Sequence, residues 1–312
     1  MSQYGAKGRA QQGQSYKDIA KAYYGSEPTT TDTGGTIKVA GQGDIDFETT
    51  YLYGIAEMPS DWPQEALKAQ AVAARSYAIR YKREGKEICT SEACQVFSKS
   101  KSDGVPGPWK QAVDETKGQV IEGVTTYYSS TAGGYSSTSG WDTTDKSDSG
   151  EWTSRAYESL AGSPWFYKAW YRKGYQNSSD SCGRSHPWLS QDEFSDIINA
   201  WIVRKNPQGA DVSRIIPTTI GQCPVGGSGG NPYSIDELRS LANQSGGAIT
   251  SISSVQSQHN GQGTTTTITL QTNKGTISIS GSEFKETFNL RAPGYISIPQ
   301  TGFSFFNIEK SN

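Results

Sequence analysis

One long alanine-rich stretch, residues 63–84, constrains the fold more than any other part of the chain. Pro63 is typical of a first helical position, where its missing amide is not needed, and Gly85 is a typical stop. Between them, alanines recur at three- and four-residue spacing, which predicts a helix about 33 Å long. Asp61 or Ser60 is expected to cap it. Because small side chains let neighbouring backbone approach closely, we place this helix at the centre of the fold.

An isolated glutamate, Glu57, lies in the break just before this helix. Pro59 pushes Met58 toward extended geometry, so the carboxylate falls between two elements of regular structure. Catalytic side chains are often held at such breaks. The non-catalytic interpretation is a carboxylate attracted to the positive end of the helix that follows.

The residues around Glu57 resemble a known family. Positions 51–59 read Tyr-Leu-Tyr-Gly-Ile-Ala-Glu-Met-Pro, and positions 62–78 read Trp-Pro-Gln-Glu-Ala-Leu-Lys-Ala-Gln-Ala-Val-Ala-Ala-Arg-Ser-Tyr-Ala. This run is similar to the signature of the SpoIID/LytB family, which includes the stage II sporulation protein D and amidase-enhancer-like peptidoglycan proteins. In that family the glutamate of Glu-Met-Pro is the catalytic acid of a lytic transglycosylase. The resemblance therefore implies this role for Glu57.

The composition narrows the classes of partner. Lysine and arginine (29) nearly balance aspartate and glutamate (31), so no strongly basic surface favours nucleic acid. Tyrosine (17) and tryptophan (8) are plentiful while charged residues make up only 19%, which suits an extracellular protein with many turns and aromatic rings for a carbohydrate groove. No apolar run is long enough to span a bilayer.

The amino-terminal residues 1–24, which open Met-Ser-Gln-Tyr-Gly-Ala, are similar to a second motif of the same family. The pattern predicts two short helices, 2–12 and 15–24, then a linker that ends at residue 35. In the family this motif usually follows the catalytic region and comes after a His-Gly-Val-Gly segment, so we expect a permuted motif order and a truncated start here. The first 25 residues lack the apolar core of a signal peptide. We expect part of a longer exported protein, extracellular or in the cell envelope; a cytosolic protein is the alternative.

Two cysteines, Cys89 and Cys94, follow the predicted helix. Their spacing suits either a zinc site that also uses histidines or a short-loop disulfide. Some sporulation members of the family carry zinc on cysteines and histidines near this point, whereas the histidines of this chain, His186 and His259, are distant in sequence. We therefore predict a Cys89–Cys94 disulfide, with zinc as the alternative. Four cysteines allow three pairings, and the remaining two would form the second bridge: Cys182 and Cys223.

A glycine-rich loop follows a predicted strand at 125–130. Positions 127–135 read Tyr-Tyr-Ser-Ser-Thr-Ala-Gly-Gly-Tyr, similar to a third family signature that lies on the catalytic side of the fold. Hydroxyls and backbone amides suit sugar hydroxyls and N-acetyl groups, and tyrosine faces suit pyranose rings; a polar surface hairpin is the alternative. Trp141 and Trp152 are spaced so that they could form the wall of a groove. The predicted substrate-binding residues are Trp62, Tyr127, Ser129, Thr131, Tyr135 and Trp141.

The whole pattern predicts an α+β fold, with a mixed sheet packed around the central helix. Residues 36–312 are expected to form one catalytic domain with an inserted subdomain at about 168–247. Further helices are predicted at 109–118, 190–202, 234–243 and 282–292, and strands at 36–40, 119–122, 249–257, 264–271 and 275–280, with 303–308 closing the sheet. Two more segments resemble family elements: Pro164-Trp165-Phe166, taken as packing, and the Phe-x-x-x-Phe-x-Leu-Arg ending at 284–291.

Other catalytic constellations are poorly supported. The sequence has no Gly-x-Ser-x-Gly elbow, phosphate-binding loop or His-Glu-x-x-His motif. With two histidines there is little scope for a triad, and a Cys94–His186 pair is explained less well than a disulfide at Cys94.

The chemistry implied by the resemblance needs one well-placed carboxyl group. In a lytic transglycosylase the C6 hydroxyl of muramic acid attacks its own anomeric carbon, whereas a hydrolytic glycosidase usually needs a second carboxyl group. We expect burial against Trp62 and Met58 to raise the pKa of Glu57. If the enzyme hydrolyses instead, the second carboxylate is sought among Asp61, Glu65 and Asp142.

The sequence therefore predicts a peptidoglycan lytic transglycosylase that cleaves the MurNAc–GlcNAc bond and leaves 1,6-anhydroMurNAc ends. Its expected partners are glycan strands and a cell-wall amidase, and no cofactor is expected apart from the zinc alternative. The competing hypothesis is a non-catalytic wall-binding or amidase-enhancing module.

Overall fold

The computed structural model describes residues 1–147, 152–164, 188–218 and 230–298, together with 302, 304–308 and 310. The chain divides into two compact units: unit 1 is Met1–Ser147 with Glu151–Phe166, and unit 2 is Asp148–Gly150 with Tyr167–Asn312. Among the described residues, no helix is both long enough and apolar enough to cross a membrane.

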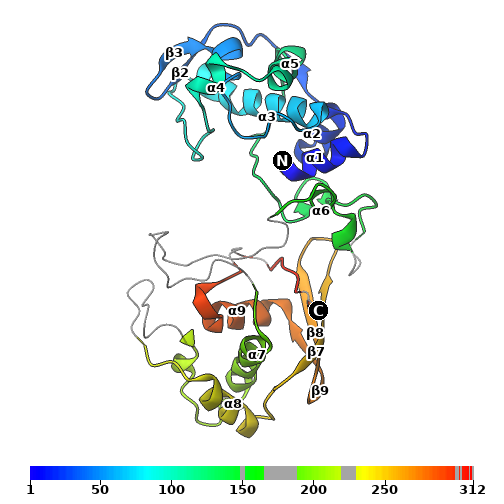
Figure 1. Cartoon of the computed structure of the whole chain (residues 1–312), viewed down its shortest axis with the longest axis vertical. Helices are drawn as coiled ribbons and strands as arrows, with labels where there is room; N and C mark the ends of the chain where they lie inside the picture. The colour runs from blue at the N-terminus through cyan, green and yellow to red at the C-terminus, as the bar shows by residue number, and fades with distance from the viewer. Residues whose placement is uncertain are drawn as a thin grey trace. The chain divides into compact units, whose positions relative to one another are not determined.

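The central helix of unit 1 is α3 (Gln64–Arg83), close to its predicted bounds. Figure 1 shows it in the middle of the unit, and α1, α2 and α5 all pack against it. The alanines Ala66, Ala69 and Ala73 are almost completely buried, as a helix surrounded by other elements requires. The predicted cap is wrong: Pro63 occupies the N-cap position, and no side chain caps the helix. The other helical elements of unit 1 are α1 (Gln3–Gln11), α2 (Tyr16–Tyr24), the π-helical turn η1 (Phe47–Tyr51), α4 (Lys99–Asp103), α5 (Gly107–Glu115), the 3-10 turn η2 (Trp152–Arg155) and α6 (Tyr157–Leu160).

The two amino-terminal helices form as predicted because each has its own start signal. Ser2 caps α1, and Ser15 forms a reciprocal capping box with Asp18 at the start of α2. Gly8 lets α1 approach α6 closely, since a Cβ at this position would lie 2.1 Å from the carbonyl oxygen of Tyr157. Residues 1–35 belong to the same unit as the central helix.

A buried ion pair joins α3 to the turn before it. Arg75 of α3 binds Glu48 of η1 in a bidentate arrangement, with Nε to Oε1 at 2.9 Å and Nη2 to Oε2 at 3.0 Å. Both side chains are almost fully buried. Because breaking such a pair leaves an unpaired charge in the core, it fixes η1 on α3 just upstream of Glu57.

The strands of unit 1 form three small antiparallel pairs. They are β1 (Thr29–Thr30) with β4 (Gln119–Val120), β2 (Thr36–Val39) with β3 (Gly43–Asp46), and β5 (Tyr135–Ser136) with β6 (Gly140–Trp141). The α+β class is confirmed, but small antiparallel sheets stand in place of one mixed sheet around α3. The predicted strand at 125–130 does not form; only an isolated bridge joins Ser129 to Ser2.

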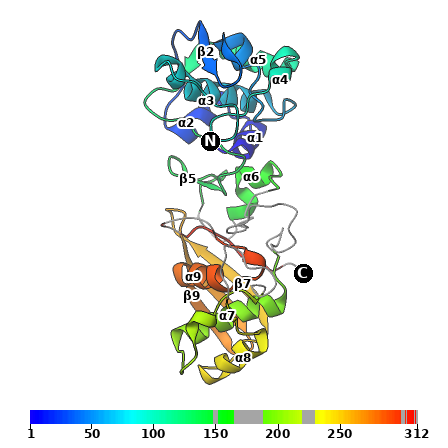
Figure 2. The same ribbon diagram turned by 90° about the vertical axis from the view of Figure 1, so that its left-hand side faces the viewer.

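Unit 2 has its own core, built on a three-stranded antiparallel sheet in the order β7-β8-β9. α9 lies against β8 and β9, and α7 packs against α9, as Figures 1 and 2 show. Arg291 of α9 binds the buried Asp196 of α7, with Nε to Oδ2 at 2.6 Å and Nη2 to Oδ1 at 3.0 Å. The elements of unit 2 are α7 (Gln191–Lys205), η3 (Val212–Arg214), α8 (Ile235–Gln244), β7 (Ile252–His259), β8 (Thr265–Thr272), β9 (Gly275–Ser280), α9 (Gly281–Arg291) and η6 (Pro293–Tyr295).

The predicted insertion at about 168–247 and the carboxy-terminal elements therefore share one unit. α7 and α8 form as predicted because Ser190 and Ser234 open them with capping boxes. Several predictions lie outside the described residues: those on Cys182, Cys223, His186, Trp165 and Phe166.

Candidate functional site

Glu57 lies in the turn between an isolated bridge, Ile55 with Phe97, and the start of α3. The backbone of Ala56 donates to the carbonyl of Val96 at 2.9 Å. In return, the amide of Val96 donates to Oε1 of Glu57 at 2.6 Å. The segment that ends at Phe97 therefore holds both the backbone and the carboxylate of this turn.

The surroundings of Glu57 favour its protonated form. Burial raises the pKa of Glu57 from its ordinary value, the hydrogen bond from Val96 lowers it, the charge of Glu92 raises it and that of Lys101 lowers it, with a net upward shift. Oε1 is held by the amide, and among the described residues no group donates to Oε2. A half-buried carboxyl group with one oxygen held and a raised pKa is suited to donating a proton.

Met58 and Trp62, the two apolar residues named from the sequence, both belong to the core of unit 1 or pack against it. Met58 is buried in the core of unit 1, and the half-buried Trp62 packs against that core. Tyr4 meets the Trp62 ring edge-on at 4.8 Å between centroids, and the Lys7 ammonium lies 4.9 Å from the ring centroid. The amino-terminal motif thus contacts a predicted substrate-binding residue directly.

Lys101 of α4 is a charged neighbour that the sequence did not single out. Its Nζ donates to the carbonyl oxygen of Ile55 at 2.7 Å and lies 4.9 Å from the Trp109 ring centroid. Burial lowers the pKa of Lys101 to about 8, while the negative charge of Glu57 opposes this shift. In the sequence, Lys101 belongs to a polar run that is typical of a solvated helix face, so nothing marked it.

Cys89 and Cys94 form a disulfide, as predicted, with their Cα atoms 5.5 Å apart. The loop they close leads directly into Gln95 and Val96, the residues beside Glu57. Among the described residues, no group of three or more histidine, cysteine or acidic side chains is arranged to hold a metal ion.

Gln95, which the sequence also did not mark, is completely buried and precedes Val96, the residue that binds Glu57. Its Oε1 accepts from the hydroxyl of Tyr51 at 2.7 Å. Its Nε2 donates to the hydroxyl oxygen of Tyr128 at 2.8 Å and to the carbonyl of Ala74 at 3.2 Å. The site therefore includes a chain of hydrogen bonds that runs from Tyr51 of η1 through Gln95, just after the disulfide loop, to Tyr128 at the start of the glycine-rich loop.

The predicted substrate-binding residues of the glycine-rich loop have different surroundings. Tyr127 is 69% exposed and its ring lies 6.0 Å from that of Tyr77, while the exposed Ser129 donates to the carbonyl of Thr131 at 2.8 Å. The Thr131 hydroxyl donates to the buried Glu158 of α6. Glu158 also accepts from the amides of Ala132 and Gly133, at 2.5 and 3.2 Å, so a buried carboxylate fixes the shape of this loop.

Trp141 does not form the wall of a groove. It is buried, and its ring centroid lies 4.2 Å from that of Trp152, which has no exposed surface. Tyr135 is half-buried and meets Trp141 edge-on at 5.6 Å. The large rings are buried here because unit 1 needs apolar volume beneath the loop, and sequence spacing cannot distinguish this from a binding surface.

The three carboxylates considered for hydrolysis lie in three different environments. Asp142 is completely buried and accepts from Arg9 Nε at 3.0 Å and from the Tyr23 hydroxyl at 2.5 Å. Glu65 accepts from the first amide of α2, that of Tyr16, at 2.8 Å and pairs with a lysine side chain. Asp61 is exposed. Two of the three are therefore bound to framework elements.

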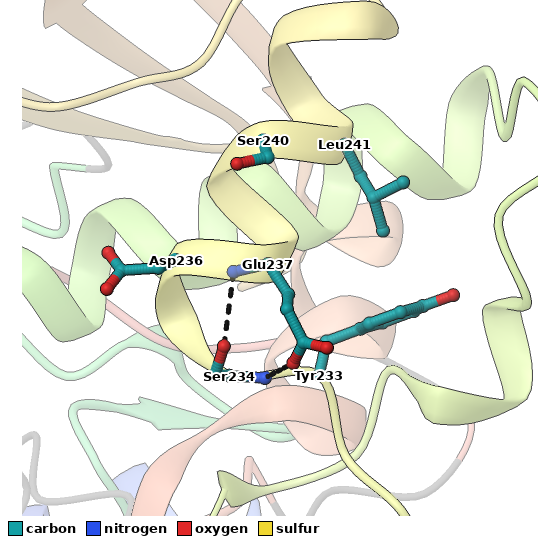
Figure 3. Close-up of a pocket in the computed structure, with 6 residues that line it drawn as sticks. All are labelled: Tyr233, Ser234, Asp236, Glu237, Ser240 and Leu241. Carbon is teal, nitrogen blue, oxygen red and sulfur yellow. Dashed lines mark hydrogen bonds between the residues drawn. The ribbon is translucent and has the colours of Figure 1, made fainter.

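A separate surface pocket of ≈ 450 Å³ lies at the start of α8 in unit 2 (Figure 3). It is lined by Tyr233, Ser234, Asp236, Glu237, Ser240 and Leu241. Figure 3 shows Ser234 and Glu237 bound to one another: the serine amide donates to the carboxylate at 2.7 Å, and the glutamate amide to the hydroxyl at 3.1 Å. These polar groups serve the helix cap, so the pocket does not compete with Glu57 as a candidate site.

Comparison with known proteins finds similarity over the region of the chain that contains Glu57. Residues 42–122, which include Glu57, the disulfide and Lys101, match the SpoIID family model, described as stage II sporulation protein. The chain carries a SpoIID/LytB family region, as predicted.

Two relatives match over a similar share of the chain. The amidase enhancer of Bacillus subtilis (strain 168) is 39% identical over 87 residues, 27% of this chain and 12% of that protein. An uncharacterized protein of Brachyspira hyodysenteriae (strain ATCC 49526 / WA1) is 40% identical over 102 residues, 27% of this chain and 26% of that protein. The chain thus spans about an eighth and about a quarter of these relatives. No solved structure matches.

Proposed function

We propose that this protein is a peptidoglycan lytic transglycosylase in which Glu57 is the general acid and base. The observation that carries the proposal is the state of this carboxyl group: it is half-buried, its pKa is raised, and one oxygen is held by Val96 while no described residue donates to the other. The match to the SpoIID family over residues 42–122 supports the same assignment.

The reaction needs only one such group. Glu57 protonates the glycosidic oxygen as the bond from that oxygen to C1 of MurNAc breaks. The ionised carboxylate then takes the proton of the C6 hydroxyl as the C6 oxygen bonds to C1, which gives the 1,6-anhydro end and returns Glu57 to its acid form. No water is consumed, so the products together have the mass of the substrate.

Two of the three carboxylates considered from the sequence are poorly placed to serve as the second group of a hydrolase. Hydrolysis usually needs a second carboxyl group about 5 to 9.5 Å from the first. Asp142 is bound to Arg9 and Tyr23 in the core, and Glu65 accepts from the Tyr16 amide at the start of α2, so both are engaged by the framework. The exposed Asp61 is the remaining candidate of the three named from the sequence.

The proposed substrate is the MurNAc–GlcNAc bond of glycan strands, in the cell envelope or outside the cell. Trp62, Tyr127, Ser129, Thr131 and Tyr135 are proposed to contact the sugars; the buried Trp141 is not included. A second function, enhancement of a cell-wall amidase without cleavage, is favoured by one observation, the name of the Bacillus subtilis relative.

The test is mass spectrometry of denuded glycan and muropeptides after incubation with the wild-type protein and with Glu57→Gln. The glutamine keeps a carbonyl oxygen for the Val96 amide, so the variant should fold normally while losing about 10²–10⁴-fold in rate. Anhydro ends from the wild type alone would support the proposal. Ordinary reducing ends would identify a hydrolase. No cleavage by either protein, with faster digestion by an added amidase, would favour the enhancer role.

A further inference from the structure

The hydroxyl of Tyr128 is oriented by a chain of hydrogen bonds whose direction can be worked out. The carbonyl of Ala74 can only accept, so the atom of Gln95 that faces it at 3.2 Å must be the amide nitrogen. The amide oxygen then faces Tyr51, whose hydroxyl donates to it at 2.7 Å. The backbone of α3 therefore fixes which way the buried Gln95 amide points.

This orientation determines the role of Tyr128. The Gln95 amide has two hydrogens; one goes to Ala74, and the other goes to the Tyr128 oxygen at 2.8 Å. Tyr128 is therefore the acceptor in this bond, and its own hydrogen must point elsewhere. Among the described ranges of the chain, no acceptor is found for that hydrogen.

The position of Tyr128 places this donor beside the candidate catalytic group. Gln95 binds Tyr128 through its side chain, and the next residue, Val96, binds Glu57 through its amide. Burial, followed by the negative charge of Glu57, raises the pKa of Tyr128 well above its ordinary value, so the hydroxyl keeps its proton across the working pH range. The Tyr128 side chain as a whole is half-buried.

We infer that Tyr128 is a substrate-orienting residue that donates a hydrogen bond to a sugar oxygen held next to Glu57, and that Gln95 positions it. This inference rests on the proposed function, because the ligand is the glycan whose bond Glu57 cleaves. The matching chemistry is a neutral acceptor, a hydroxyl or an N-acetyl carbonyl, since a neutral phenol donates without a charge. The neighbouring Tyr127, singled out from the sequence, has an exposed side chain and lacks this support.

The first measurement is binding of a GlcNAc–MurNAc tetrasaccharide, by calorimetry, to the Glu57→Gln protein, in which cleavage is blocked. Adding Tyr128→Phe removes one hydroxyl and keeps the ring, so affinity should fall about three- to tenfold. Tyr53→Phe is the matched control, because its hydroxyl donates to Asp114 at 2.6 Å, outside the site; affinity should stay within about twofold. The inference would be overturned if the Tyr128→Phe change left the affinity of the Glu57→Gln protein unaltered. It would also be overturned if the Glu57→Gln protein itself did not bind the tetrasaccharide.

A second measurement keeps the test decisive if Tyr128→Phe folds poorly. In the Glu57→Gln protein with ¹³C-labelled tyrosine, the Cζ resonance of Tyr128 should move when the tetrasaccharide is added, and that of Tyr53 should not. Gln95→Leu should reduce this movement, because the hydroxyl loses its fixed direction. A Tyr128 resonance that does not respond to bound sugar refutes the inference.

Failure of the inference and failure of the proposed function give different results. If wild type produces anhydro ends and Tyr128→Phe matches its kcat and KM, the inference alone is wrong. If sugar binding depends on Tyr128 but no anhydro ends form, the donor role stands and the reaction assignment fails.

Discussion

Unit 1 contains two carboxylates, Asp142 and Glu57, whose surroundings differ sharply. In the Asp142 region (Arg9, Tyr23, Asp142 and Glu158), Asp142 is completely buried and both of its oxygens accept hydrogen bonds, from Arg9 and from Tyr23. In the Glu57 region (Glu57, Gln95, Val96, Lys101 and Tyr128), one carboxylate oxygen accepts from one backbone amide. The first group is fully bound by the protein, whereas the second is only partly bound.

This difference separates a structural carboxylate from a chemical one. Asp142 and its partners join α1, α2 and the segment after the glycine-rich loop, so their hydrogen bonds serve the framework. Glu57 is held firmly enough to be positioned, and its second oxygen is left for a ligand. A carboxylate can only exchange protons with a substrate if the protein does not use all of its acceptor capacity.

The largest expected effect is on stability, from Asp142→Asn. This change leaves the buried Arg9 guanidinium without its negative partner, so the free energy of unfolding should fall by about 3–5 kcal/mol. The matched change at the other region, Glu57→Gln, should alter it by less than about 1 kcal/mol. Urea unfolding at pH 7, followed by near-ultraviolet circular dichroism, measures both.

The direction of the stability change expected at Glu57 follows from its raised pKa. Any stability linked to this group is fully present below its unfolded-state pKa and is lost as pH rises through the higher folded-state pKa. At pH 7 the glutamine variant should therefore be as stable as wild type or slightly more stable. Equal losses from Asp142→Asn and Glu57→Gln would contradict the distinction between the two regions.

Local signals made the framework of unit 1 predictable from sequence. Ser2 and Ser15 start their helices through their own side chains, and the alanine spacing in α3 determines a central helix without reference to any partner. Glu57 was identified because a sequence resemblance marked it. The Cys89–Cys94 disulfide was predicted correctly over zinc because the histidines of the chain are distant in sequence.

What the sequence missed depends on contacts between distant residues. Trp141 was expected on a surface, but it is buried against Trp152 because the core beneath the loop needs its volume. Gln95 and Tyr128 are joined by a hydrogen bond although they are 33 residues apart in sequence, and no local pattern predicts such a bond. Lys101 was missed for the same reason, because its hydrogen-bond partner, the carbonyl of Ile55, is distant in sequence.

An intermediate effect is expected from removing the Cys89–Cys94 disulfide with the double change Cys89→Ser and Cys94→Ser. Loss of this short closed loop should reduce the free energy of unfolding by about 2 kcal/mol. The loop leads into Val96, whose hydrogen bond lowers the pKa of Glu57, so loosening it should raise that pKa further. Thermal unfolding and ¹³C NMR titration of the Glu57 carboxyl group measure the two consequences.

Reductant provides the control for this experiment. Adding dithiothreitol to wild type should reproduce the double variant, and adding it to the double variant shows any effect of the other two cysteines. An unchanged Glu57 titration in the double variant would mean that the disulfide does not help to hold the Val96 amide.

The smallest effect is expected from Lys101→Met, on the pH dependence of the proposed cleavage. Glu57 must be protonated to act as an acid, so the rate falls as pH rises through the pKa of Glu57. The positive charge of Lys101 lowers that pKa, and its removal should move the alkaline limb of kcat/KM to higher pH, with the plateau unchanged within about twofold. Lys99→Met on the same helix is the control, because Lys99 is exposed and pairs with Asp103.

The wild-type profile provides a second check on this coupling. The pKa of Lys101 is lowered to about 8, so above that pH the lysine loses its charge and no longer lowers the pKa of Glu57. The wild-type and Lys101→Met profiles should therefore differ most at neutral pH and converge above pH 8. If the two profiles have the same shape at every pH, Glu57 does not sense Lys101, and burial, the Val96 hydrogen bond and the charge of Glu92 set the pKa of Glu57.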